Sequence, residues 1–198
     1  MARPKHTGGA SRPLEQREVK RLLTVVSNSN RNRERNTMLI KTLLYTAGRI
    51  SEVLFLKVSD VWDGKSVYPS LVFRKTKNKH TRRIPINSNF ASDLEQYIKT
   101  SELKLNDPLI PSTRSSSGNN HINPTAGSLL VKRLMVSAGI TDCSAHSTRK
   151  YALCHMLRNN VNIRTLQAIS GHRSINSLEH YLYSSSSEIS DAIETISF

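Results

Sequence analysis

The apolar residues of this chain recur at the spacing of α-helices along most of its length and change to strand-like runs in one short stretch. Val19, Leu22, Leu23 and Val26 stand at i, i+3, i+4 and i+7, which places them on one face of a helix. Residues 58–86 instead hold short β-branched and aromatic runs between turn signals. We therefore predict a mainly α fold with a small three-stranded antiparallel sheet.

The first helix is expected to begin where Ser11 can act as a cap and Pro13 can occupy the first turn. Further helices are predicted where apolar stripes recur, at residues 39–47, 53–56, 90–98 and from 125 onward, with breaks near Gly139 and Gly171. A chain of 198 residues can bury such a core as a single domain.

The predicted sheet starts with a hairpin around the Asp63-Gly64 turn. In this hairpin residues 58–62 pair with residues 66–68. A strand at residues 71–73, a basic loop and a strand at residues 83–86 then complete the sheet. The loop between the last two strands is rich in lysine and arginine, so we expect a cationic tip on the sheet.

Three segments are expected along the chain. Residues 1–12 are basic and rich in Gly, Ser and Pro, which predicts a flexible tail. Residues 13–183 form the folded domain. In residues 184–198 a serine run leads into a helix with an apolar isoleucine stripe that must be buried somewhere. That tail helix either folds back on its own domain or docks on a neighbouring protomer.

The charge of the chain points to a polyanionic partner. Its formal net charge is +14 and its pI is about 10.2, which makes nucleic acid the first candidate. No apolar run approaches the roughly 20 residues that span a bilayer, and the start lacks the apolar core of a secretory signal. We therefore expect a cytoplasmic protein without a membrane partner. The spacing of its cysteines and histidines predicts neither a disulfide nor a metal site.

Cutting a phosphodiester bond without a metal ion requires three kinds of side chain. A nucleophile attacks phosphorus, cations stabilise the charge that builds on the non-bridging oxygens, and an acid protonates the leaving 5′-oxygen. Arginine suits the cationic role because its planar guanidinium grips phosphate bidentately. Lysine or histidine suits the acid, and a tyrosine whose pKa is lowered by cations suits the nucleophile.

The chain carries this set in separated segments. They are Arg49 within Thr46–Glu52, the lysine-rich sheet tip, His146 and Arg149 as H-x-x-R, Gly171-His172, and Tyr181 nine residues after His172. In this order the motifs resemble the tyrosine recombinase family of phage integrases, Cre and Xer proteins. The resemblance covers nearly the whole chain. It implies the DNA breaking-rejoining enzyme fold, with residues 13–183 as the catalytic domain.

The resemblance also implies a role for each residue of the pocket. Arg49 and Arg149 would clamp the scissile phosphate, and His146 would hold it and assist proton transfer. His172 would form a hydrogen bond with the phosphate, and Glu52 would support the pocket from behind.

The nucleophile and the acid each have a rival close by in the sequence. Tyr181 has the family's spacing from the preceding histidine and Tyr183 does not, so we predict that Tyr181 attacks the phosphate. Lys75 heads a Lys-Thr pair seen in several family members, whereas counting back from Pro85 at the commonest spacing selects Lys77. Lys75 is our prediction for the acid that protonates the leaving oxygen, and Lys77 stays open.

Other basic residues are expected to contact the DNA, namely Arg74, Lys77, Lys79, Arg82, Arg83, Lys150 and Arg173. Two positions depart from the family pattern next to the pocket. The family's Thr-Gly-x-Arg is Thr46-Ala47-Gly48-Arg49 in this chain. Ser170 stands where the family's Leu-Gly-His has leucine. The family's N-terminal helical domain also has no counterpart in this sequence, which resembles either the single-domain fimbrial phase-switching recombinases or a shortened piece of a longer family member.

The implied activity is site-specific DNA recombination, whether integration, excision or inversion. A tyrosine would form a 3′-phosphotyrosine and free a 5′-hydroxyl, and four protomers on two duplexes would exchange strands through a Holliday junction at the nucleoid. Because the covalent intermediate holds the bond energy, neither ATP nor another cofactor is expected. A type IB topoisomerase shares this chemistry, but it typically has lysine in place of His146. A catalytically idle DNA-binding protein is the third reading, and the complete residue set argues against it.

Overall fold

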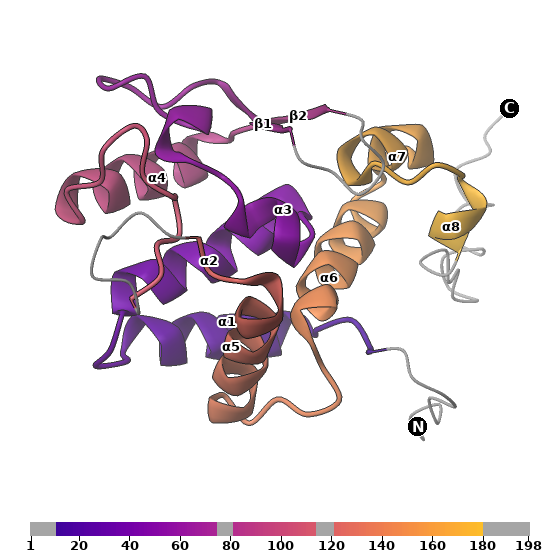
Figure 1. Ribbon diagram of the computed structural model, residues 1–198. Coiled ribbons are helices and arrows are strands. Elements are labelled where there is room, and N and C mark those ends of the chain that lie inside the picture. The colour runs from indigo at the N-terminus through magenta and orange to yellow at the C-terminus, as the bar shows by residue number, and fades with distance from the viewer. Residues whose placement is uncertain (1–10, 75–80, 114–120, 180–198) are drawn as a thin grey trace, which may run out of the picture.

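The computed structural model describes residues 11–74, 81–113 and 121–179, which form a mainly helical domain (Figure 1). Its elements in chain order are α1 (Gln16–Ser27), α2 (Arg33–Thr46), α3 (Ile50–Leu54), the 3-10 turn η1 (Val58–Asp60), β1 (Ser70–Phe73), β2 (Arg82–Pro85), α4 (Ser88–Thr100), α5 (Pro124–Ser137), α6 (Ala145–Arg158), α7 (Ile163–Ser170) and α8 (Asn176–Glu179). None of these helices is long and apolar enough to cross a bilayer.

Helix α2 lies at the centre of the domain and contacts α1, α3, α4 and α6 (Figure 1). Its residues Leu39, Ile40 and Leu43 are completely buried, because neighbouring helices cover more than one side of it. These side chains join the apolar faces of α1, α4 and α5 in the main core. The predicted stripe at residues 39–47 is therefore confirmed as a helix of the core up to Thr46, where α2 ends.

The sheet differs from the three-stranded one that the sequence predicts. In the part of the chain that the structure describes, only β1 and β2 pair as strands, antiparallel with Leu71 opposite Ile84. Residues 58–60 form a 3-10 turn instead of a strand. The backbone N–H of Val58 donates to Asp107 O, and the N–H of Val61 donates to Val58 O. With the backbone of residues 58–61 engaged in this way, one isolated bridge, between residues 62 and 67, is present where a hairpin was expected.

The first helix begins at Gln16 and not at Pro13 as predicted. Arg12 reaches past the helix start and bonds both carboxylate oxygens of Glu18, at 2.7 and 2.6 Å. The Ser11 hydroxyl, expected to act as a helix cap, instead lies 3.0 Å from the Ser144 hydroxyl. The tertiary contacts of Ser11 and Arg12 thus replace the helical turn that the local sequence favours.

A second, smaller apolar cluster joins the end of α2 to α6, α7 and α8. Its buried members are Ala47, Ala152, Leu153, Leu166 and Leu178. Helix α7 ends at Gly171, which adopts the left-handed backbone with φ +66°. A side chain at this position would meet β2, because an added Cβ would lie 3.1 Å from Arg82 Nη1. A glycine is therefore needed where α7 approaches the sheet.

We predict that Gly171→Ala destabilises the protein more than Gly139→Ala. Both glycines have a left-handed backbone, which costs an alanine about 1–2 kcal/mol. At Gly139 an added Cβ has its nearest neighbour 4.0 Å away, so backbone strain is the whole cost. At Gly171 the crowding against Arg82 adds roughly 1–3 kcal/mol. Urea unfolding of both variants measures the difference, and equal losses would contradict the close approach of α7 to β2.

Candidate active site

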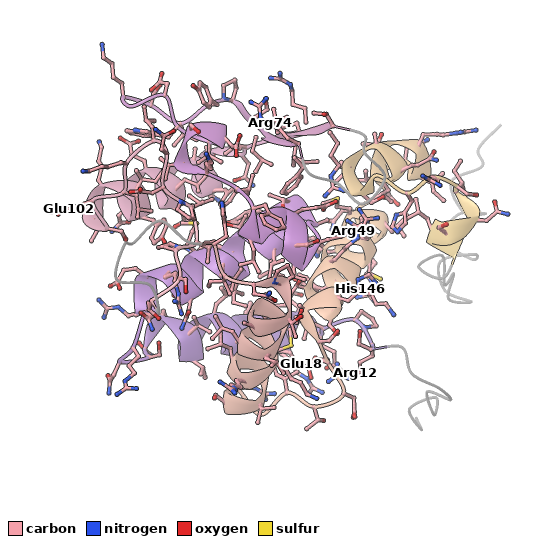
Figure 2. The ribbon with its side chains drawn as sticks, viewed as in Figure 1. Arg12, Glu18, Arg49, Arg74, Glu102 and His146 are labelled. Carbon is pink, nitrogen blue, oxygen red and sulfur yellow. The ribbon has the colours of Figure 1, made fainter. Side chains whose placement is uncertain are left out.

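The connection between α2 and α3 places Arg49 at the start of a short helix. Ala47 ends α2 with a left-handed backbone, φ 46°, and Arg49 caps α3 from an extended one. Gly48 between them has no room for a side chain, since an added Cβ would lie 2.8 Å from Val53 Cγ2. This tight turn directs the Arg49 side chain toward the region where α3, α6 and α7 meet (Figure 2). The Arg49 side chain keeps 25% of its surface exposed.

Glu52 lies beneath Arg49 and is almost completely buried. One of its oxygens accepts from Arg49 Nη1 at 2.8 Å, and the other accepts from the Arg49 backbone N–H at 2.8 Å and from Arg82 Nη2 at 2.7 Å. A buried carboxylate is stable only when it is paired and hydrogen-bonded in this way. The supporting role predicted for Glu52 agrees with this geometry, because it holds the Arg49 guanidinium in place.

Arg82 is buried in β2 and points into the protein. Its Nη1 donates to the backbone oxygen of Ser170 at 2.6 Å, and its guanidinium carbon lies 4.7 Å above the Phe73 ring. Burial lowers the pKa of Arg82, and the charge of Glu52 opposes that shift. Such burial is at odds with the DNA contact that we predicted for Arg82. Strand alternation was the overlooked signal, because Arg82 shares its face with the apolar Ile84.

Arg149 reaches from the buried face of α6 to two backbone oxygens. Its Nη1 donates to Ala47 O and its Nη2 to Ser170 O, both at 2.7 Å. The Ser170 carbonyl therefore accepts from Arg149 and Arg82 together. These bonds fix the Arg149 guanidinium between the end of α2, next to Arg49, and the end of α7, next to His172.

Two histidines complete the cluster of positive groups. Helix α6 carries His146 one turn before Arg149, and Figure 2 shows His146 on the same side of the molecule as Arg49. Desolvation lowers the pKa of His146, and the charges of Arg149, Lys150 and Arg49 lower it further.

The pKa of His172 falls to about 4, because desolvation and the charges of Arg149, Arg49, His146 and Arg82 all disfavour its protonated form. Nδ1 of His172 lies 2.7 Å from the Ser170 hydroxyl. Arg149 bonds Ala47 O, two residues before Arg49, and Ser170 O, two residues before His172, and His146 lies one turn before Arg149 on α6. The structure thus gathers Arg49, His146, Arg149 and His172 from three distant segments.

The remaining predicted catalytic residues, Lys75, Lys77 and Tyr181, lie outside the described residues, as do Lys79 and the tail helix. The described residues end shortly before two of them, Lys75 and Tyr181. Arg74 follows β1 directly before Lys75, and Leu178 in α8 is buried in the second apolar cluster three residues before Tyr181.

Four predicted DNA contacts lie on α6, on the sheet or after α7. Arg74 and Arg83 are exposed; Arg74 Nε lies 3.2 Å from Asp60, and Arg83 donates to the Ser70 hydroxyl at 3.1 Å. Arg173 is also exposed. Lys150 is half-buried and donates to the Ser11 backbone oxygen at 2.6 Å.

The cluster suits a tetrahedral oxyanion. Two guanidinium groups and two imidazoles gather beside the buried carboxylate of Glu52, which is already neutralised by arginines. A phosphate group would supply the negative charge that such a cluster lacks. Across residues 11–74, 81–113 and 121–179, no group of three or more His, Cys, Asp or Glu side chains is arranged to hold a metal ion.

Comparison with known proteins gives matches over nearly the whole chain. Tyrosine recombinase XerA of Pyrococcus horikoshii is 30% identical over 195 residues, which is 98% of this chain and 64% of that protein. A crystal structure of XerA recombinase superposes with a TM-score of 0.74 at 23% identity, covering 100% of this chain and 68% of the other. XerH recombinase, solved after cleavage with a palindromic difH substrate, gives a TM-score of 0.73 at 21% identity, over 96% of this chain and 55% of the other.

The two structural likenesses establish the fold, and the chain spans just under two thirds of the length of the Pyrococcus relative. The match to the family model establishes more than the fold. Residues 12–188 correspond to the phage integrase family, and this range includes every predicted catalytic residue. Together with the observed gathering of the arginines and histidines, that match shows that the chain belongs to the phage integrase family of tyrosine recombinases.

Proposed function

We propose that this chain is the catalytic part of a site-specific recombinase that cuts and rejoins DNA through a 3′-phosphotyrosine. The observation that carries the proposal is the cluster of Arg49, His146, Arg149 and His172, in which Glu52 holds Arg49, two backbone oxygens hold Arg149 and the Ser170 hydroxyl lies against His172. Such preorganised donors stabilise charge that develops in a transition state without further reorganisation.

The scissile phosphate would bind against the two arginines. Charge on its non-bridging oxygens rises as the nucleophile approaches, and guanidinium groups remain charged throughout because their pKa is too high for them to lose a proton. Arg49 is held by Glu52, and Arg149 is held by two carbonyl oxygens. The Arg49 side chain keeps 25% of its surface exposed, so it can bind phosphate while Glu52 anchors it.

The histidines act as neutral groups at pH 7. A His172 pKa of about 4 means that its ring carries one N–H, which serves as a hydrogen-bond donor to the phosphate. The pKa of His146 is also lowered, so its ring has a free lone pair at neutral pH. That lone pair can take the phenol proton of Tyr181 as the oxygen attacks phosphorus.

The reaction exchanges one ester bond for another. The bond between phosphorus and Tyr181 Oη forms while the bond to the 5′-oxygen breaks, and Lys75 or Lys77 protonates that oxygen. A 5′-hydroxyl from the partner strand then attacks the phosphotyrosine and restores the phenol. The number of phosphoester bonds is unchanged, so the strand transfer is energetically neutral and needs no ATP.

The described structure supports the delivery of Tyr181 to this cluster. Leu178 packs in the same apolar cluster as Ala47 and Leu153. Ala47 lies two residues before Arg49, and Leu153 lies one helical turn after Arg149. The segment that leads to Tyr181 is thus packed on the elements that hold both arginines.

Double-stranded DNA is the proposed substrate, and two features support it. XerH, a structural neighbour, was solved bound to its DNA substrate. In addition, Arg74, Arg83 and Arg173 present exposed charges that can contact neighbouring phosphates. We further propose that protomers assemble as tetramers on two duplexes, within the compartment that holds the DNA.

We predict that Tyr181→Phe abolishes covalent capture of DNA and leaves DNA binding intact, because the change removes one nucleophilic oxygen and no charge. Tyr183→Phe is the matched control and should still cleave. A nicked suicide duplex built from the DNA that flanks the gene reports the covalent adduct as a band of lower mobility. Loss of the adduct in the Tyr183 variant alone would assign the nucleophile to Tyr183, and absence of any adduct in the wild type would overturn the enzymatic proposal.

Arg49→Ala should slow cleavage by about 10²–10³-fold, the usual effect of losing one donor to a developing oxyanion. Arg74→Ala is the control, since it removes an exposed arginine outside the cluster. With saturating DNA in a single turnover, the control should cleave at close to the wild-type rate. If the two variants slow cleavage equally, Arg49 acts through general attraction of DNA and not at the reacting phosphate.

Stability of the DNA-free protein should fall as the pH is lowered from 6.5 to about 4. In this window the unfolded chain binds a proton at His172, whose ordinary pKa is 6.5, while the folded chain does not until the pH reaches about 4. His172→Gln removes this contribution, so its unfolding free energy should depend less on pH over the same range. Urea unfolding at a series of pH values measures both slopes; identical slopes would show that the His172 pKa is not depressed.

A further inference from the structure

Ser170 occupies a central place beside the proposed catalytic cluster. It is the last residue of α7 and is completely buried. Its backbone oxygen accepts from Arg82 at 2.6 Å and from Arg149 at 2.7 Å, and its hydroxyl lies 2.7 Å from Nδ1 of His172. The backbone bonds hold the residue rigidly, so the hydroxyl meets the imidazole in a defined position.

We propose that Ser170 is a positioning residue whose hydroxyl donates to Nδ1 of His172 and thereby keeps the ring proton on Nε2. The proposal rests on the recombinase activity argued above and deepens it. The hydroxyl is not part of the family pattern, in which leucine precedes the Gly-His pair. The ring of His172 therefore has an anchor in this chain that an apolar residue cannot provide.

The location of the ring proton needs to be controlled only when the imidazole of His172 is neutral. A protonated imidazole has an N–H on both nitrogens, whereas a neutral one has a single N–H that can sit on either. Desolvation and the surrounding positive groups favour the neutral form of His172 at pH 7. A ring with its proton on Nδ1 would turn a lone pair toward the phosphate and repel it, so the location of the proton decides whether His172 helps.

The distances favour donation from Ser170 to the ring. A hydroxyl donates best at about 2.5–3.0 Å. Nδ1 of His172 lies at 2.7 Å, while the alternative acceptor, Gln167 O, lies at 3.3 Å. A phosphate on the opposite edge of the ring adds to this preference, because an N–H bond to an anion is stronger than one to a neutral oxygen. Both effects place the proton on Nε2.

The tautomer can be measured directly in the full chain. In ¹⁵N spectra of histidine-labelled protein at pH 7, the protonated ring nitrogen resonates well upfield of the unprotonated one, and His172→Gln identifies the signals of His172 among the seven histidines. The wild type should show its proton on Nε2. Ser170→Ala should shift the ring toward a mixture of both tautomers. A wild-type ring with its proton on Nδ1, or a tautomer unchanged in Ser170→Ala, overturns the proposal.

Cleavage measurements then test whether the hydroxyl acts through His172. Losing one positioning hydrogen bond should slow cleavage of the suicide duplex by about 3- to 10-fold in Ser170→Ala. In a His172→Gln background the same change should have no further effect. Ser92→Ala is the control, since it removes a helical hydroxyl bonded to Ser88 O on α4 and should cleave normally. Equal slowing in both backgrounds would mean that Ser170 supports the fold and not the ring.

These measurements separate the proposal from the activity on which it rests. If the wild type shows the Nε2 proton but forms no covalent adduct with DNA, the recombinase assignment fails and the Ser170 contact stands as structural. If the wild type cleaves but Ser170→Ala leaves both rate and tautomer unchanged, the assignment stands and the positioning role fails.

Discussion

The buried carboxylate of Glu52 is the interaction on which the site depends. It lies between the guanidinium groups of Arg49 and Arg82. A buried charge of this kind is tolerated only while its partners stay in place, so it fixes α3 against β2. From there the contacts continue around the site in a closed circuit of Glu52, Arg82, Ser170, Arg149 and Ala47, with Arg49 following Ala47 in the chain. Residues far apart in sequence thus fix one another's positions around the site.

That circuit concentrates positive charge, and the two histidines respond to the resulting repulsion. Desolvation lowers the pKa of both rings, and the charges of Arg149 and Arg49 lower it further, so both rings favour the neutral form where an isolated histidine would begin to titrate. A bound phosphate would relieve the repulsion between the arginines. The neutral histidines can then donate or accept a single proton next to the anion, which a fully cationic cluster could not do. In this arrangement the arginines would stabilise negative charge, and the histidines would transfer protons.

The sequence predicted more of the site than of the local structure around it. Arg49, His146, Arg149 and His172 could be identified because each lies in a short motif, and their order along the chain is distinctive. Local rules failed where tertiary contacts prevailed. Arg12 bonds the backbone oxygens of residues 141 and 142 where the first helix was expected, and backbone bonds to residues 105 and 107 replace the predicted first strand. The burial of Arg82 was missed because a basic residue in a basic loop was taken to face DNA. Its pairing partner Glu52 lies 30 residues away, and no local pattern connects the two.

The position of Ala47 suggests why phosphate binding by Arg149 and the approach of the nucleophile should depend on each other. Its backbone oxygen binds Arg149, and its side chain packs in the cluster that contains Leu178. Ala47 adopts a left-handed backbone that costs about 1 kcal/mol or more for a residue other than glycine, so the surrounding contacts must impose it. A shift of α8 would disturb Leu178 and then Ala47, and the carbonyl that orients Arg149 would move with it. Ala47 therefore links the apolar cluster that holds α8, the helix before the proposed nucleophile, to the arginine that would receive the phosphate.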